Sequence, residues 1–391
     1  MLTHLDFVPV RDAEIFASVP AAPAIFLLRA DDSHSEPYIT KTANLRRRLE
    51  RLLGPPKERS KRLNLRDRVR HIEFIPTGSD FESGYLLYQL LRTLLPKTYA
   101  DRLRLRFAPL IKLHLENEYA RASVTTRLGR RQGKAVYYGP FPSRAAAEKY
   151  ANDSLDFFKM RRCVDDLNPD PKFPGCIYSE MKMCLAPCFK GCTDEEYRAE
   201  VSRVEAYFDS GGRSLLHEIS SQREAASTNL DFETAATLHA RLEKLQPSLT
   251  QLPEIVRRID RLSALMVQPS ATPQSVNFFR VDSACIDGPL VFPIQSAEHI
   301  KSQSIESRIQ EALAASHPGS TKTALETMEH LALLKRWYYR SHRLGEIFFT
   351  DEKGVLPFRR IVRGISRVYR GEKAEPEPVQ PAAVQPGENR S

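Results

Sequence analysis

The segment APAIFLLRADDSHSEPYITKTANLRRRLERLLG, residues 22–54, decides the fold of the N-terminal part of the chain. Its first apolar run predicts a buried strand, DDSHSE is rich in turn-forming residues, and PYIT predicts a second short strand. The remainder predicts a helix that closes at Gly54 and has one apolar face, formed by Leu45, Leu49, Leu52 and Leu53. Strand, turn, strand and helix in this order indicate a small unit that mixes both kinds of element.

Short strands and helices alternate along the rest of the chain, so the expected fold class is multidomain α+β. Strands are expected in HIEFIPTG and between residues 110 and 139, and a β-hairpin over 275–294 that turns at Asp287-Gly288. Helices are expected over 81–95, from Ser143 onward, two or three times between 194 and 245, and over 304–315 and 321–343.

These patterns divide the chain into five expected parts. They are a small αβ domain (1–108), a cysteine-rich region (109–200), a helical region (201–252), a C-terminal α+β domain of unknown role (253–371) and a disordered, Pro-rich tail (372–391).

Composition argues for a globular protein outside membranes. Of the 391 residues 41% are hydrophobic, and no apolar run approaches the eighteen residues that a membrane-spanning helix needs. The N-terminus MLTHLDFVPVRDAE lacks the basic-then-apolar layout of a secretory signal. We therefore expect a cytoplasmic protein with no membrane partner.

Positive charge is concentrated between Lys41 and Arg70. Twelve Lys or Arg residues stand there against three acidic ones, a surplus of nine that equals the +9 of the whole chain. Because such a patch attracts polyanions and releases their counterions, it predicts nucleic-acid binding rather than a merely solvated surface. The DNA-binding candidates are Lys41, Arg46, Arg47, Arg48, Arg51, Lys57, Arg59, Lys61 and Arg62.

Five of the six cysteines lie within thirty residues. In a cytoplasmic protein such clustering favours a metal centre over disulfides. The spacing C-x12-C-x7-C-x3-C from Cys163 has none of the C-x2-C knuckles usual at zinc sites. An iron–sulfur cluster, probed by wider spacing, is the preferred interpretation, with zinc as the alternative. The expected ligands are Cys163, Cys176, Cys184 and Cys188, while Cys285 is expected to be a core residue.

Two segments around these cysteines resemble the UvrC family, whose members are incision subunits of bacterial nucleotide excision repair. They are YYGPFPSRAAAEKYANDSLDFFKMRRC (137–163) and CIYSEMKMCLAPCFKGCTDEEYRAEV (176–201). The resemblance implies a four-cysteine iron–sulfur cluster, most simply [4Fe-4S], held by the same four residues. Cys192 lies outside the family pattern.

A third segment, LLHEISSQREAASTNLDFETAATLHARLEKLQ (215–246), resembles the UVR motif. In the family this motif is a helical hairpin that docks on UvrB. Small alanines on the predicted helices favour close approach, and Phe232 gives a partner an aromatic anchor. The partner-binding candidates are Leu230, Phe232, Ala235, Ala236 and Leu238.

The N-terminal segment resembles the family's GIY-YIG nuclease, but only in part. PYITKTANLRRRL keeps Tyr38, Lys41 and Arg48 as remnants of the catalytic set. Phe26 stands where the first tyrosine is expected, and Tyr88 where the metal-binding glutamate is expected. Without that carboxylate a divalent ion is not expected at a nuclease site, so no intact catalytic set remains.

The resemblance therefore implies a UvrC-like component or modulator of excision repair that binds DNA and UvrB without cutting. One alternative is an active structure-specific endonuclease in which Glu73 or Glu82 holds the metal. A second alternative is an iron–sulfur interaction module that does not bind DNA. The C-terminal 140 residues or so are too short for both the RNase H-like and helix-hairpin-helix modules of the family.

Overall fold

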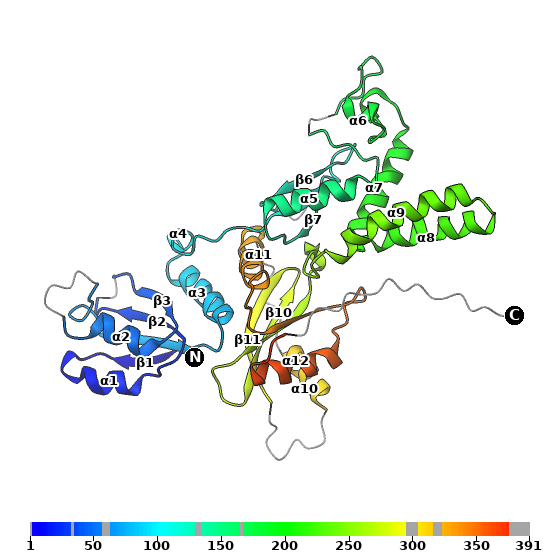
Figure 1. The fold of residues 1–391 in the computed structure, drawn as a ribbon. Coiled ribbons are helices and arrows are strands. Elements are labelled where there is room, and N and C mark those ends of the chain that lie inside the picture. Colours follow the sequence, from blue (N-terminus) through cyan, green and yellow to red (C-terminus); the bar gives the residue numbers. More distant parts are fainter. Residues whose placement is uncertain are drawn as a thin grey trace. The chain divides into compact units, whose positions relative to one another are not determined.

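A computed structural model of the protein describes residues 2–32, 35–56, 63–129, 134–164, 167–294, 304–315 and 323–374 (Figure 1). It contains helices and three four-stranded antiparallel sheets, which confirms a mixed α and β fold. The chain divides into two compact units. Residues 1–106, 263–322 and 329–374 form the first unit, and residues 107–262 with 323–328 belong to the second. Among the described residues no helix is both long and apolar enough to cross a membrane.

The first sheet contains the strands predicted from residues 22–54. Its order is β1 (Thr3–Asp6), β4 (His71–Pro76), β2 (Ala24–Arg29) and β3 (Tyr38–Thr42). Both faces of β2 are buried, because its alternate residues contribute to two separate core clusters. One cluster includes residues of α1 (Asp12–Ser18) and α2 (Leu45–Leu53), and the other includes residues of α3 (Asp80–Leu94) and α4 (Tyr99–Leu103). Edge strand β1 was not predicted from the sequence.

The second sheet of this unit lies near the C-terminus of the chain. Its order is β11 (Cys285–Pro293), β10 (Ser275–Asp282), β9 (Ala264–Pro269) and β12 (Glu346–Phe349). Helices α10 (Ile305–Ala315) and α12 (Phe358–Arg370) share one apolar cluster with it. On β10, Phe279 meets Phe81 of α3 edge-on, with ring centroids 5.0 Å apart. The two sheets of the unit are thus connected through α3.

The hairpin turn predicted at Asp287-Gly288 is wrong. The chain turns instead at Ser283 and Ala284, both in the left-handed region with φ of 48° and 63°. Gly288 lies inside β11 at an irregularity in the register. A Cβ atom there would lie 2.7 Å from the carbonyl oxygen of Phe278, so the glycine serves close strand approach rather than a turn.

Helix α11 (Ala324–Tyr338) falls within the predicted 321–343 helix but ends earlier. Residues from Glu329 onward belong to the first unit. The predicted tail begins at residue 372, and its part from 375 onward lies outside the described residues.

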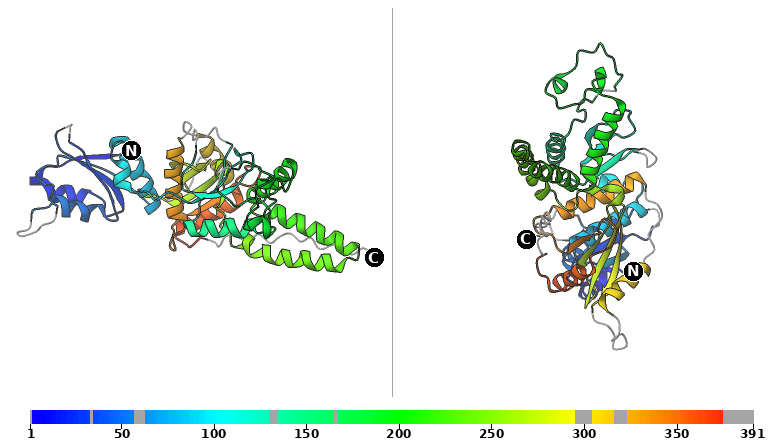
Figure 2. Two further views of the ribbon diagram at one scale, coloured as in Figure 1. Left: turned by 90° about the horizontal axis from the view of Figure 1, so that it is seen from above. Right: turned by 90° about the vertical axis from the view of Figure 1, so that its right-hand side faces the viewer.

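The second unit carries the cysteine-rich region and the helical hairpin. Its sheet has the order β6 (Ala122–Thr125), β5 (Leu110–Leu113), β7 (Val136–Gly139) and β8 (Arg257–Arg258). Helices α5 (Arg144–Leu155) and α7 (Asp194–Asp209) accompany the sheet, and the short α6 (Ile177–Glu180) lies among the cysteines. Figure 2 shows α8 (Arg213–Thr228) and α9 (Phe232–Thr250) side by side as a long antiparallel pair.

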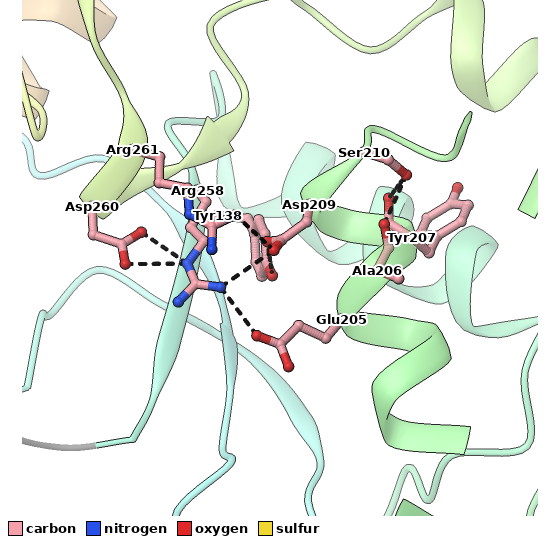
Figure 3. Close-up of polar contacts among 9 residues, drawn as sticks. All are labelled: Tyr138, Glu205, Ala206, Tyr207, Asp209, Ser210, Arg258, Asp260 and Arg261. Atoms are coloured by element: carbon pink, nitrogen blue, oxygen red, sulfur yellow. Dashed lines mark hydrogen bonds and ion pairs between the residues drawn. The ribbon is translucent and has the colours of Figure 1, made fainter. Parts of the chain in front are cut away.

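A polar cluster joins the residues after this hairpin to the sheet (Figure 3). Arg258 of β8 donates to Glu205 at 3.0 Å and to Asp209 at 3.3 Å, both on α7. Tyr138 of β7 donates to the other oxygen of Asp209 at 2.7 Å, and burial together with this carboxylate raises the pKa of Tyr138. The chain therefore leaves the sheet layer after α7, forms the hairpin, and returns to it at Arg258.

Replacing Arg258 by alanine is expected to lower the free energy of unfolding by about 2 kcal/mol, because Asp209 and Glu205 lose a half-buried charged partner. Urea unfolding followed by circular dichroism measures this loss. Arg261→Ala is the matched control, since Arg261 also contacts Asp209, at 3.1 Å, but its side chain is 64% exposed. We expect that control to change stability by less than about 0.5 kcal/mol. Equal losses for the two variants would contradict the anchoring role of Arg258.

Candidate functional site

Tyr38 and Arg48, two of the predicted nuclease remnants, lie together in the structure. Asn44 caps α2 through its side-chain oxygen, and this places Arg48 in the first turn of the helix. From there the Arg48 guanidinium donates to the Tyr38 hydroxyl on β3 at 3.0 Å. Phe26 is fully buried, and its ring centroid lies 6.1 Å from that of Tyr38. The place expected for a first tyrosine is therefore filled by an apolar core ring.

Lys41, the third remnant, is neutralised by a carboxylate. Its ammonium donates to Asp80 at 2.5 Å, and Arg340 donates to the other oxygen of Asp80, also at 2.5 Å. Partial burial acts to raise the pKa of Asp80, but the bonds and charges of Lys41 and Arg340 hold it below its usual range. The sequence analysis did not identify Asp80 or Arg340.

Tyr88 is buried in α3, where its hydroxyl donates to Glu329 of α11 at 2.9 Å. The second oxygen of the Glu329 carboxylate accepts from Tyr99 at 2.8 Å. Arg92 in turn donates to the Tyr88 hydroxyl at 3.0 Å. The carboxylate next to the position expected for a metal ligand thus comes from a distant helix and is already bonded by two phenols. Nothing in the sequence around Glu329 indicated this role.

Glu73 and Glu82, the carboxylates considered for an active nuclease, are engaged elsewhere. Glu73 pairs with Arg29 across the first sheet at 2.7 Å. Glu82 is buried, accepts the backbone N–H of Gly78 at 2.7 Å, and has its pKa raised by burial. Within the described ranges, neither belongs to any group of three potential ligand atoms that lie within 4.8 Å of one another.

The basic residues of α2 serve two different purposes. Arg46 donates to the backbone carbonyls of Val19 and Ala17, at 2.9 and 3.1 Å, and so ties α2 to the end of α1. Arg47 and Arg51 are exposed. They are the residues of this helix available to a phosphate backbone. The remaining DNA-binding candidates, Lys57, Arg59, Lys61 and Arg62, lie outside the described residues.

The four predicted metal ligands lie in one region of the second unit. All are free thiols, and burial raises the pKa of Cys184 to about 11, with charge repulsion from Cys163, Cys188 and Cys176 adding to the shift. In the described part of the chain no three sulfur atoms lie within 4.8 Å of one another. A single zinc ion bonded at about 2.3 Å keeps its thiolates within about 4.6 Å of one another, so the present spacing is wider than one zinc ion requires.

Hydrogen-bond donors surround these thiols. The backbone N–H of Ala186 donates to the Cys184 sulfur at 3.3 Å, and Arg161 donates to the Cys163 sulfur at 3.4 Å. Arg161 is 2% exposed and also donates to the carbonyl of Tyr119 at 2.9 Å. A buried guanidinium and N–H donors suit anionic thiolates, so this donor set fits a metal–thiolate centre. The sequence analysis did not single out Arg161.

The two other cysteines differ in their surroundings. Cys192 is half-buried, and burial together with the charges of Glu196 and Asp194 raises its pKa. Acidic neighbours disfavour a thiolate, which agrees with its place outside the predicted ligand set. Cys285 begins β11 and is half-buried rather than deep in a core.

The predicted hairpin is present, with Leu230 in the left-handed region at φ 60° in the connection between α8 and α9. Its tip exposes two large apolar side chains, since Leu230 is 71% and Phe232 is 68% exposed. Ala236 is exposed and Ala235 is half-buried. Leu238, at 8% exposure, packs inside the hairpin and supports the surface from within.

Comparison with known proteins adds to this geometry. Residues 109–207 match the family model described as the UvrC/Cho excinuclease middle domain. The chain is UvrC-like. The matched segment includes the sheet strands β5 to β7, the four candidate metal ligands and most of α7.

Curated relatives agree with this match. The UvrABC system protein C of Carboxydothermus hydrogenoformans is 27% identical over 60% of this chain and 38% of its own length. The proteins of the same name from Alcanivorax borkumensis and Rickettsia africae are 30% and 26% identical, over 54% and 69% of this chain. The matches span between about a third and two fifths of the relatives' own lengths. No solved structure matches the chain significantly.

Proposed function

We propose that this UvrC-like chain is a DNA- and UvrB-binding component or modulator of nucleotide excision repair that does not itself cut DNA. The observation that carries the proposal is the occupied position of the expected metal ligand. Tyr88 stands there, and the nearby Glu329 carboxylate accepts hydrogen bonds from Tyr88 and Tyr99 on its two oxygens. A nuclease of this type needs a free carboxylate to hold the ion that polarises the phosphate.

Other contacts around the remnants support the same proposal. Phe26 offers no hydroxyl, and Lys41 is paired with Asp80. Glu73 and Glu82, the carboxylates of the active-nuclease alternative, are bonded to Arg29 and Gly78. Grip on DNA then rests on exposed cations such as Arg47 and Arg51, whose attraction for phosphates needs no metal.

The cysteine region supports an iron–sulfur cluster as the resident cofactor. Cys163, Cys176, Cys184 and Cys188 would hold it, and a [4Fe-4S] cluster there would act as a structural or sensing element rather than a catalytic one. Its wider spacing of thiolates suits the present sulfurs better than a single zinc ion does. Arg161 would offset part of its negative charge from within the core.

The tip of the α8–α9 hairpin is the proposed docking surface for UvrB. Leu230 and Phe232 together expose an apolar patch that the hairpin itself does not cover. Exposed aromatic anchors of this kind contribute strongly to protein interfaces when a partner buries them. Leu238 and the alanines of α9 keep the two helices in register behind the patch.

Incision is the first test. The purified chain, incubated with UvrB, a lesion-bearing duplex and Mg²⁺ or Mn²⁺, is expected to give no nicks while still retarding the duplex in a gel at low salt. A full-length UvrC serves as the positive control. Nicks that disappear in Tyr38→Phe would overturn the non-cutting proposal, because contaminating nucleases do not depend on Tyr38. Absence of any salt-sensitive DNA binding would leave the iron–sulfur interaction module as the better description.

Metal content is the second test. Anaerobically purified protein is expected to be brown and to carry about four iron atoms per chain. Cys184→Ser is expected to lose most of that iron because it removes a ligand. Cys192→Ser is the matched control and is expected to keep it. A colourless protein with one zinc per chain contradicts the iron–sulfur assignment.

Docking is the third test. Phe232→Ala is expected to weaken UvrB binding about tenfold or more, measured by calorimetric titration, without changing thermal stability, since Phe232 is 68% exposed. Tyr369→Ala removes a comparably exposed aromatic ring from α12 and is expected to leave binding unchanged. If Phe232→Ala binds UvrB as tightly as the wild type, the hairpin tip is not the docking surface.

A further inference from the structure

Two histidines and an aspartate gather at the outer edge of the first sheet. Strands β1 and β4 are paired so that Asp6 lies opposite His71 and His4 lies opposite Glu73. His4 and Asp6 are two residues apart on one strand, so they share a face. The rings of His4 and His71 are stacked, with centroids 5.3 Å apart and planes inclined by 28°.

The potential ligand atoms of these three residues lie close together. Asp6 Oδ1 is 2.8 Å from His71 Nδ1 and 3.3 Å from His4 Nε2, and all three atoms lie within 4.8 Å of one another. A metal ion bonded to nitrogen and oxygen at about 2.0–2.1 Å with tetrahedral angles separates its ligand atoms by about 3.4 Å. Small rotations of exposed side chains suffice to reach that spacing.

The charges around the group favour a cation. Asp31 Oδ1 lies 3.7 Å from His71 Nε2, the ring nitrogen that does not face Asp6. A carboxylate on that side orients a ligating imidazole and increases its basicity. Arg29 is opposite His71 on β2, but its guanidinium pairs with Glu73 at 2.7 Å, so its charge is compensated.

We propose that His4, Asp6 and His71 form a binding site for a divalent transition-metal ion of the zinc type. Two imidazoles and one carboxylate suit zinc, cobalt or nickel, whereas magnesium and calcium prefer oxygen ligands alone. The site is separate from the four cysteines and from the nuclease remnants. Because His4 is 55% and Asp6 72% exposed, water or an anion completes the coordination.

The ion would fasten the N-terminal strand to the sheet. Strand β1 has only four residues, three of them exposed, and it pairs with β4 alone. A metal bound by residues 4, 6 and 71 links the edge strand to β4 across 65 positions of sequence. Metal binding to the folded state is therefore expected to raise its stability.

The test uses the full chain, because the cysteines also bind zinc and must remain in place. After treatment with EDTA, zinc chloride is added, unbound ion is removed by dialysis, and bound zinc is counted by elemental analysis. We expect His71→Ala and His4→Ala each to bind one zinc fewer than the wild type. X-ray absorption is expected to show that the missing ion has nitrogen and oxygen neighbours at about 2.0–2.1 Å rather than sulfur at about 2.3 Å.

Stability supplies a second readout. Zinc at about a hundred times its Kd is expected to raise the Tm of the first unit by about 5 °C in the wild type but not in the two variants. His239→Ala is the matched control, since His239 also faces a carboxylate, Glu243 at 3.6 Å, but has no third ligand nearby. His4→Ala keeps the test valid if His71→Ala does not fold, because His4 is the more exposed. Equal zinc content in the wild type and His4→Ala, or an equal loss in His239→Ala, overturns the proposal.

Discussion

The buried carboxylate of Glu329 constrains the whole first unit. An ionised carboxylate removed from water costs several kcal/mol unless hydrogen bonds replace its hydration. Glu329 is 3% exposed and obtains those bonds from Tyr88 and Tyr99, which belong to α3 and α4. A glutamate at position 88 would instead bring two carboxylates together, which like-charge repulsion disfavours. The tyrosine that removes the expected metal ligand is therefore also the residue that lets α11 pack against α3.

The same packing changes what the remaining nuclease-like residues can do. Arg340, which follows α11, joins Lys41 on Asp80, so the carboxylate at the start of α3 is shared by two cations. Arg48 stays with Tyr38, and this pair is the most complete part of the old catalytic set. A phenol and a guanidinium can orient a phosphate, but without a metal they supply little of the charge stabilisation that hydrolysis requires. The geometry thus favours holding DNA over cutting it.

Local patterns predicted much of the fold, because strands and helices with apolar faces announce themselves within a few residues. The elements of residues 22–54 and the α8–α9 hairpin are examples. Strand β1 was missed because THLD has no apolar alternation and exposes three of its four residues. The bonds to Glu329 could not be foreseen either, since they join residues 241 and 230 positions apart and depend on tertiary packing alone. The misplaced hairpin turn has a local cause: Gly288 resembles a turn residue but serves a bulge.

Ligand chemistry separates the two proposed metal centres of this chain. The thiols of the second unit are partly buried, and the guanidinium of Arg161, which contacts one of them, favours soft ligands in their anionic form. The His4, Asp6 and His71 group is open to water and offers harder nitrogen and oxygen atoms. Iron–sulfur chemistry needs the first environment and gains nothing from the second. A mononuclear zinc-type ion is served by the second without competing for the cysteines. The two sites can therefore be loaded and lost independently, one controlling the cysteine-rich unit and the other the edge of the nuclease-like sheet.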